Sequence, residues 1–251
     1  MRYLSGGSGE DFRKTERKNN IFKAATYNVH QWRDRHGRKD PNKALRVIRS
    51  LQADVLAIQE VSFFFSRSQP FHLRDLEHAT GMRAVPGMTL CRKDSHFGNV
   101  LLTGHRVHDI CRLDLSVKGR EPRGAIMVTV EMENVPIRVL ATHLGLKRYE
   151  RRHQLRQILD EVRRTDPGVL LILGDLNEWR PFGMVSRFLQ IHFGRTWSPP
   201  SYPSHFPVLA LDRILVRPAR ARKTIEAVKT PPAPTASDHL PVAAIIDPRV
   251  F

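Results

Sequence analysis

Short apolar runs closed by glycine or polar residues recur along the chain, and this pattern predicts buried β-strands. Six of these runs end in, contain or directly follow polar residues, and they cover residues 24–30, 54–61, 139–144, 170–175, 209–216 and 242–246. Further strands are expected over residues 90–102, 110–115, 125–131 and 137–142. The last two would form a hairpin across Glu133-Asn134.

Amphipathic segments between the strands predict helices. One begins at Asp40-Pro41, where aspartate is the N-cap and proline takes the first helical position. The others are expected over residues 71–80, 149–164 and 181–190, and residues 198–207 form a Pro-rich loop. The 149–164 helix has one apolar face, and its other face carries Arg148, Arg151, Arg152, Arg156 and Arg163. Helices mixed with hairpins favour a layered α/β sandwich over a simple alternating parallel sheet.

The chain is strongly basic, with 41 Lys and Arg against 25 Asp and Glu and a formal net charge of +16. This balance favours anionic partners such as nucleic acid, a phosphorylated metabolite or an acidic membrane surface. A solubilising basic surface explains the charge equally well. The 251 residues, 41% of them hydrophobic, suit one α/β catalytic domain over residues 21–251 behind a flexible basic arm at residues 1–20.

The cysteines and the N-terminal residues indicate the cellular compartment of the protein. Cys91 and Cys111 are the only cysteines, so the sequence implies no disulfide framework and favours a reducing environment. Residues 1–20 lack the apolar segment of a secretion signal, and no apolar run approaches the length that spans a bilayer. We therefore expect a cytoplasmic protein without a transmembrane segment, and a monomer.

The most informative run ends in GDLNEWR, because it places Asp175 and Asn177 two residues apart at the end of a strand. Alternate side chains of a strand share a face, so this carboxylate and this amide should project together. Gly-Asp-x-Asn also makes ordinary turns, and the motif therefore needs partners. The other runs supply them, with Asn28, Glu60, His143, Asp212, Asp238 and His239. A buried carboxylate is costly unless it is paired or binds a metal, so these residues are candidates for a shared site.

Six segments in this order, AATYNVH, LAIQEV, ATHLGL, ILGDLNEW, LDRILV and SDHLPV, resemble the signature of the endonuclease/exonuclease/phosphatase superfamily. The matches run from Ala24 to Ile246, and the chain most closely resembles small bacterial members. The resemblance implies the deoxyribonuclease I-like fold, an α/β four-layer sandwich of two mixed β-sheets flanked by helices. The superfamily includes sphingomyelinases, inositol-phosphate phosphatases and abasic-site endonucleases, so the resemblance implies chemistry at a phosphoester.

Phosphodiester cleavage needs charge neutralised on the phosphoryl oxygens, an aligned water and a proton for the leaving group. Glu60 is the first candidate ligand of a hard cation, with Asn28 or Asp238 beside it. Oxygen donors without a Cys/His cluster favour Mg²⁺, with Mn²⁺ as a substitute, over Zn²⁺. Asp175 would orient or deprotonate the water, and Asn177 would hold a phosphoryl oxygen.

Two histidines complete the expected site. Asp212 and His239 resemble the family's carboxylate–imidazole pair, in which the carboxylate fixes the orientation of the ring. His143 resembles the second family histidine, and which of the two is general acid and which is base stays open. Asp212 could instead form an ion pair with Arg213 in a purely structural strand.

The expected substrate contacts are weaker and comprise Trp32, Arg123, Trp179 and Arg180. Aromatic residues beside arginines can stack bases and hold phosphates, whereas the run Phe63–Phe65 could enter a lipid interface or cover the core. We therefore expect a divalent-metal-dependent phosphodiesterase that acts on nucleic acid or a phospholipid-like substrate. The alternatives are a DNA or RNA endonuclease or exonuclease proper, and a basic nucleic-acid- or membrane-binding module with a vestigial site.

Overall fold

The structure, a computed structural model, describes residues 21–64, 72–91, 95–164, 168–180, 183–194 and 196–250. Within this part of the chain the strands form two mixed sheets, of six and five strands. The first has the order β10-β11-β1-β2-β4-β3 and comprises β1 (Phe22–Asn28), β2 (Val55–Phe64), β3 (Arg83–Cys91), β4 (Ser95–Thr103), β10 (Arg222–Ala227) and β11 (Val242–Ile246). The second has the order β5-β6-β7-β8-β9 and comprises β5 (Val107–Asp114), β6 (Gly124–Met132), β7 (Val135–His143), β8 (Val169–Asp175) and β9 (Asp212–Arg217).

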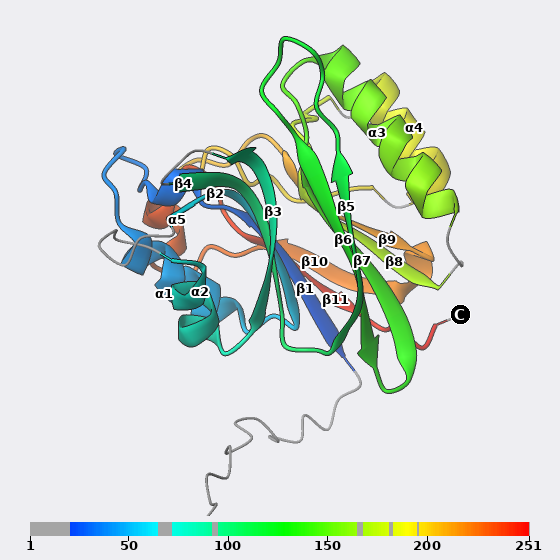
Figure 1. Cartoon of the computed structure of the whole chain (residues 1–251), viewed down its shortest axis with the longest axis horizontal. Helices are drawn as coiled ribbons and strands as arrows, with labels where there is room; N and C mark the ends of the chain where they lie inside the picture. Colours follow the sequence, from blue (N-terminus) through cyan, green and yellow to red (C-terminus); the bar gives the residue numbers. More distant parts are fainter. Residues whose placement is uncertain are drawn as a thin grey trace, which may run out of the picture.

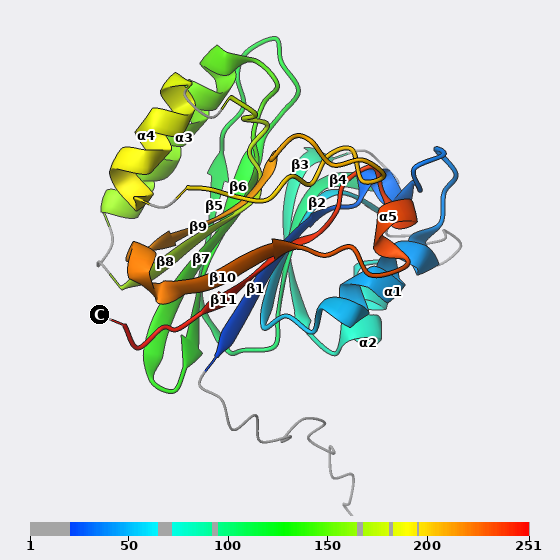
Figure 2. The same cartoon turned by 180° about the vertical axis from the view of Figure 1, so that it is seen from behind.

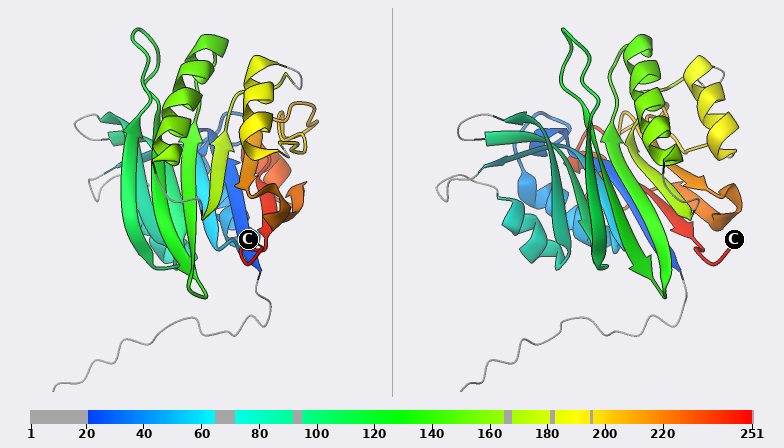
Figure 3. Two further views of the ribbon diagram at one scale, coloured as in Figure 1. Left: turned by 90° about the vertical axis from the view of Figure 1, so that its right-hand side faces the viewer. Right: turned by 45° about the vertical axis from the view of Figure 1, so that its right-hand side comes forward.

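Helices cover the outer face of each sheet and complete four layers (Figure 1, Figure 2). The first sheet is covered by α1 (Pro41–Leu51), α2 (Leu73–Thr80) and α5 (Ala233–Ala236), and the second by α3 (Arg148–Arg163) and α4 (Met184–Phe193). Two short 3₁₀ turns, η1 (His30–Trp32) and η2 (Ala219–Ala221), follow β1 and β9. Figure 3 shows the layers from the side. This is the four-layer α/β sandwich that the resemblance implied.

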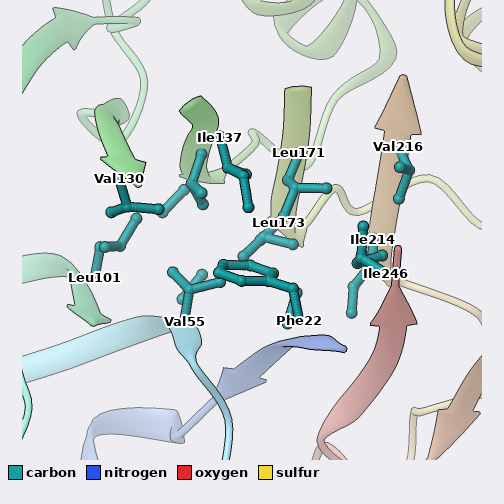
Figure 4. Close-up of a cluster of buried hydrophobic side chains, with 14 of the residues drawn as sticks. Phe22, Val55, Leu101, Val130, Ile137, Leu171, Leu173, Ile214, Val216 and Ile246 are labelled. Carbon is teal, nitrogen blue, oxygen red and sulfur yellow. The ribbon is translucent and has the colours of Figure 1, made fainter. Parts of the chain in front are cut away.

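The main apolar core lies between the two sheets. Phe22 and Val55 of the first sheet face Leu171 and Ile214 of the second across it (Figure 4). Strand side chains alternate between faces, so the other face of β8 packs under α3 and α4, where Ile172 is buried. Because both faces of β8 are covered, its sequence is apolar without alternation.

Several local predictions are confirmed. Asp40 caps α1, because its Oδ1 accepts the N–H of Lys43 at 2.9 Å, and Pro41 opens the helix. Gly81 ends α2 in the left-handed conformation with a φ of 64°. The β6–β7 hairpin turns at Glu133 and Asn134, whose φ values are 50° and 65°.

Other local predictions are wrong. The single strand expected over residues 90–102 is an antiparallel pair, β3 and β4, in which Cys91 pairs with His96. The strand β10 was not anticipated. Both β3 and β10 form sheet edges, and their half-exposed side chains weaken the apolar pattern that marks a buried strand. The helix expected over residues 181–190 and the strand expected over residues 209–216 are both present with shifted bounds, as α4 (Met184–Phe193) and β9 (Asp212–Arg217).

The arginine face expected on α3 also needs correction. Arg151 is only 5% exposed, and its guanidinium contacts the Glu178 carboxylate at 3.3 Å and the Leu146 carbonyl oxygen at 2.6 Å. The expected arm at residues 1–20 and Phe65 lie outside the described residues, as do the side chains of Phe63 and Phe64. No helix of the described residues has the length and apolar character needed to cross a membrane.

Candidate active site

The candidate site lies where strand ends from both sheets meet. β1 is parallel to β2 and β7 is parallel to β8, so the carboxyl ends of each pair lie together. Asn28 ends β1, and His143 pairs in register with Asp175 at the ends of β7 and β8. β9 runs antiparallel to β8 and begins at Asp212, directly opposite Asp175. The topology therefore gathers residues that lie far apart in the sequence.

Asn28 links the two sheets through its side-chain amide. Its Nδ2 donates to Glu60 Oε1 at 3.1 Å and to Asp175 Oδ2 at 3.2 Å. Its Oδ1 accepts the backbone N–H of His30 at 3.0 Å, which fixes the orientation of the amide. Asn28 is 1% exposed and Asp175 is 2% exposed. Two carboxylates from different sheets thus converge on one buried amide group.

Unusual backbone conformations surround this cluster. Glu60, Asn177 and His30 have φ values of 57°, 51° and 46°, a region that residues other than glycine rarely adopt. Glu60 lies in an irregularity of β2, between Ile58 and Val61, where the register against β4 shifts. Such strained residues concentrate at functional sites because the surrounding structure must hold them in place.

His143 is a neutral histidine. Burial, aided by the nearby Arg123 and His239, lowers its pKa from 6.5 to about 3 despite the Asp175 carboxylate. The Arg123 Nη1 lies 3.2 Å from His143 Nδ1, and because a guanidinium can only donate, Nδ1 is the acceptor. Nε2 lies 3.5 Å from Asp175 Oδ2 and 3.1 Å from Asn177 Nδ2, which can only donate, so a donor faces each ring nitrogen.

His239 is a protonated histidine. Burial alone would lower its pKa, but the Asp212 carboxylate, with help from Asp175, raises it to about 10. Nδ1 of the ring lies 2.8 Å from Asp212 Oδ2, which also accepts the Ser201 hydroxyl at 2.5 Å. Nε2 lies 3.8 Å from Asp175 Oδ2. The ring of Tyr202 packs against the imidazole with centroids 4.8 Å apart.

Asp175 therefore lies between two histidines in opposite protonation states. Its Oδ1 accepts the backbone N–H of Asn177 at 2.9 Å, and the Asn177 side chain donates to the Leu144 carbonyl at 2.9 Å. These bonds hold the carboxylate and the neighbouring amide in fixed positions at the end of β8. In this arrangement the Asp175 carboxylate can accept a proton from water, and the His239 imidazolium can donate one to a leaving group.

The donor set suits a hard divalent cation better than a transition metal. Glu60 and Asp175 are carboxylates that share one amide partner, and burial, together with the Asp175 charge, raises the pKa of Glu60 above its usual value. Asp175, Asp212 and His239 also have ligand atoms within 4.8 Å of one another. His239 Nδ1 and Asp212 Oδ2 already contact each other at 2.8 Å, however, and Asp212 Oδ2 also accepts the Ser201 hydroxyl. The carboxylate oxygens of Glu60 and Asp175 are the better fit, because Asn28 turns its Nδ2 toward them and its Oδ1 toward the His30 N–H.

Asp238 is connected to these carboxylates only indirectly. Its Oδ1 lies 3.6 Å from His30 Nδ1, and the backbone of His30 donates to Asn28. No spacing in the sequence marked His30, Ser201 or Tyr202 as part of the site. Their placement depends on the turn after β1 and on the Pro-rich loop, neither of which has a periodic pattern.

The expected substrate residues separate into two groups. Trp179 is exposed with Arg180 stacked 5.0 Å from its ring centre, and the buried Arg123 contacts Glu121 and His143. Trp32 is 3% exposed in the core, and its indole N–H donates to the Ser62 carbonyl at 2.7 Å, which argues against a substrate contact.

The alternative of an Asp212–Arg213 ion pair is not observed. The Arg213 guanidinium donates to the carbonyl oxygens of Thr196 at 2.9 Å and Glu178 at 2.8 Å, whereas the Asp212 carboxylate contacts His239 and Ser201.

Residues 25–239 match the model of the Endonuclease/Exonuclease/phosphatase family, and the chain belongs to this family. The uncharacterized protein YbhP of Escherichia coli (strain K12) is 29% identical over 253 residues, which cover 90% of this chain and 96% of that protein.

Two solved structures share the fold. An endonuclease/exonuclease/phosphatase from Beutenbergia cavernae DSM 12333 has a TM-score of 0.69 at 19% identity and covers 91% of this chain and 72% of its own. The mannosyl-6-phosphatase Bt3783 of Bacteroides thetaiotaomicron VPI-5482 has a TM-score of 0.69 at 14% identity and covers 90% and 99%. The family and the fold implied by the sequence motifs are thus confirmed.

Proposed function

We propose that this protein is a divalent-metal-dependent phosphodiesterase in which water attacks phosphorus in a nucleic-acid or phospholipid-like substrate. The observation that carries the proposal is the convergence of Asn28, His143 and His239 on Asp175 Oδ2, at 3.2, 3.5 and 3.8 Å. Asp175 can accept the proton of the attacking water and the His239 imidazolium can supply one to the leaving group, and these are the two proton transfers that hydrolysis requires.

Glu60 and Asp175 would hold Mg²⁺, or Mn²⁺ in its place; Asn28 would join them through its Oδ1 after its amide turns away from the His30 N–H, and Asp238 lies behind His30. When bound, the cation neutralises charge on the phosphoryl oxygens. Asp175 orients the attacking water and accepts its proton as the new P–O bond forms. His239, which Asp212 holds in position and keeps charged, donates the proton on Nε2 to the oxygen of the breaking P–O bond. The proton on Asp175 can then return to His239, because the two groups are 3.8 Å apart.

Two other residues would bind the phosphoryl group. Asn177 is held beside Asp175 by its own backbone N–H, and its amide would hold a phosphoryl oxygen. His143, whose ring nitrogens face Arg123 and Asn177, would donate to a second oxygen. This assignment makes His239 the general acid and His143 a neutral hydrogen-bond donor.

Particular observations bear on the two alternatives. The net charge of +16 suits a nuclease acting on DNA or RNA. A basic binding module with a vestigial site is disfavoured, because Asp175, Asp212 and His239 remain buried and mutually hydrogen-bonded or charge-paired.

Hydrolysis of bis(p-nitrophenyl) phosphate with added Mg²⁺ tests the proposal. Asp175→Asn and His239→Ala should each abolish activity, and a chelator should do the same to the wild type. His153→Ala, which changes an exposed histidine of α3, is the matched control and should keep full activity. Full activity in either site variant, or activity that a chelator does not change, contradicts the proposal. Plasmid DNA, RNA, abasic duplex and phospholipid vesicles then separate the substrates.

A further inference from the structure

Large apolar side chains are exposed on the segments that follow β7 and β8 and on the turn between Tyr202 and Val208. Soluble surfaces normally scatter such residues singly, so a group of them around one site calls for a function. They are Leu146, Tyr149, Trp179, Phe206 and Val208, each more than half exposed. We call these five residues the apolar rim.

One part of the rim follows the ends of β7 and β8. Leu146 comes three residues after His143, and Trp179 comes two residues after Asn177. Arg151 binds both segments, because its guanidinium donates to the Leu146 carbonyl at 2.6 Å and contacts Glu178 at 3.3 Å. One buried guanidinium thus ties the backbone at Leu146 to Glu178, the residue before Trp179.

The other part belongs to the loop before β9. Val208 donates its backbone N–H to the Tyr202 carbonyl at 2.9 Å, and the turn between them carries Phe206. Tyr202 packs on the imidazole of His239, and Ser204 N–H donates to the Asp238 carbonyl at 2.7 Å. This loop is therefore attached directly to the residues proposed to act on the phosphate.

Basic side chains accompany the rim. The Arg180 guanidinium stacks on Trp179, and that of Arg120 lies 5.6 Å from the ring centre of Tyr149. Lys147 and Arg148, between Leu146 and Tyr149, are also exposed. Apolar and aromatic side chains interspersed with Lys and Arg are the composition that binds an anionic lipid interface.

We propose that the apolar rim docks this protein onto an anionic phospholipid bilayer, with the active site facing the headgroups. Aromatic rings beside arginines would also suit single-stranded nucleic acid, but Leu146 and Val208 have no ring on which a base could stack. Their exposure favours lipid, because burying such side chains among acyl chains is favourable. Docking needs only the rim, and the inference that the substrate is a membrane phosphodiester rests on the function proposed above.

Vesicle co-sedimentation in the presence of EDTA tests the docking independently of catalysis. The vesicles are phosphatidylcholine with about one quarter phosphatidylglycerol, and pure phosphatidylcholine serves for comparison. The variant combines Leu146→Ser, Phe206→Ser and Val208→Ser. Its affinity for anionic vesicles should fall at least about 30-fold, at roughly three- to tenfold for each lost side chain. Ile191→Ser, an equally exposed apolar residue on α4, should change affinity less than about twofold.

Soluble substrate separates this proposal from the proposed function. The triple variant should hydrolyse bis(p-nitrophenyl) phosphate like the wild type, because none of its changes touches the buried cluster. Equal vesicle binding by wild type and triple variant overturns the docking proposal. Tight binding of a single-stranded oligonucleotide without vesicle binding also overturns it, in favour of nucleic acid. Normal vesicle binding with no hydrolysis of any phosphoester leaves docking intact and refutes only the function.

Discussion

Asp212→Asn should destabilise the protein by an amount that depends on pH, because the lost carboxylate holds a proton on His239. The pair is buried, with Asp212 fully inaccessible and Nδ1 of His239 2.8 Å from its Oδ2. Asparagine preserves the shape and can still accept the Ser201 hydroxyl. The substitution therefore removes chiefly the charge.

The magnitude follows from the pKa of His239, which is about 10 in the folded protein and 6.5 without perturbation. At about 1.4 kcal/mol per pH unit, this difference corresponds to roughly 5 kcal/mol of folding stability. Because the folded-state pKa is the higher one, the stabilisation is fully present below pH 6.5 and is lost as the pH rises to 10. Asp175 also attracts the proton, so we expect Asp212→Asn to cost about 3 kcal/mol at pH 6 and under about 1 kcal/mol at pH 10.

Urea unfolding at several pH values between 6 and 10, followed by tryptophan fluorescence with EDTA present, measures this cost. NMR titration of the His239 ring measures the pKa itself and should show a fall in the variant. Asp160→Asn, on the exposed face of α3, is the control and should change stability by less than about 0.5 kcal/mol. A cost that stays constant from pH 6 to pH 10, or a wild-type His239 pKa below 7, refutes the reasoning.

Three further predictions concern the backbone, the cation and a buried ion pair. Gly174→Ala should lower the free energy of unfolding by about 3 kcal/mol or more, since a Cβ there would lie 1.9 Å from a main-chain oxygen of β7. Thermal melts measure this loss, and Gly104→Ala, with open space around the added methyl group, is the control that should be nearly neutral. Mg²⁺ should raise the Tm of the wild type, and Glu60→Gln should reduce that rise in a thermal-shift titration; an equal rise in both would exclude Glu60 as a ligand. Arg151→Met should cost about 3–5 kcal/mol in urea unfolding because it leaves a buried carboxylate unpaired, whereas a comparable loss for the exposed Arg152→Met would contradict this explanation.

Local signals in the sequence correctly predicted the ends of helices, because each end depends on one capping interaction. The Asp40-Pro41 pair specified the start of α1, and Gly81 specified the end of α2, because capping depends on a few neighbouring residues. Edge strands were harder to predict. β3 and β10 are half-exposed, so neither shows the apolar run that identifies a strand covered on both faces.

The candidate site was predictable as a set of residue types but not as a geometry. Asn28, Asp175 and His239 were each predicted to be site residues because each is a polar residue beside an apolar run. Their hydrogen bonds depend on how the two sheets pack, and the bond between Asn28 and Asp175 joins residues 147 positions apart. The roles of Trp32 and Arg151 were misjudged for a related reason, because a tryptophan or arginine is exposed or buried according to the elements that pack around it.

The apolar runs and amphipathic segments of the sequence indicated a layered α/β sandwich, and the resemblance carried by six motifs in a fixed order implied the family and its two-sheet fold. Only the tertiary structure decided which histidine is charged. His143 and His239 are the same residue type, and each is buried beside Asp175. One faces the guanidinium of Arg123 and the other the carboxylate of Asp212, and these opposite charges drive their pKa values apart.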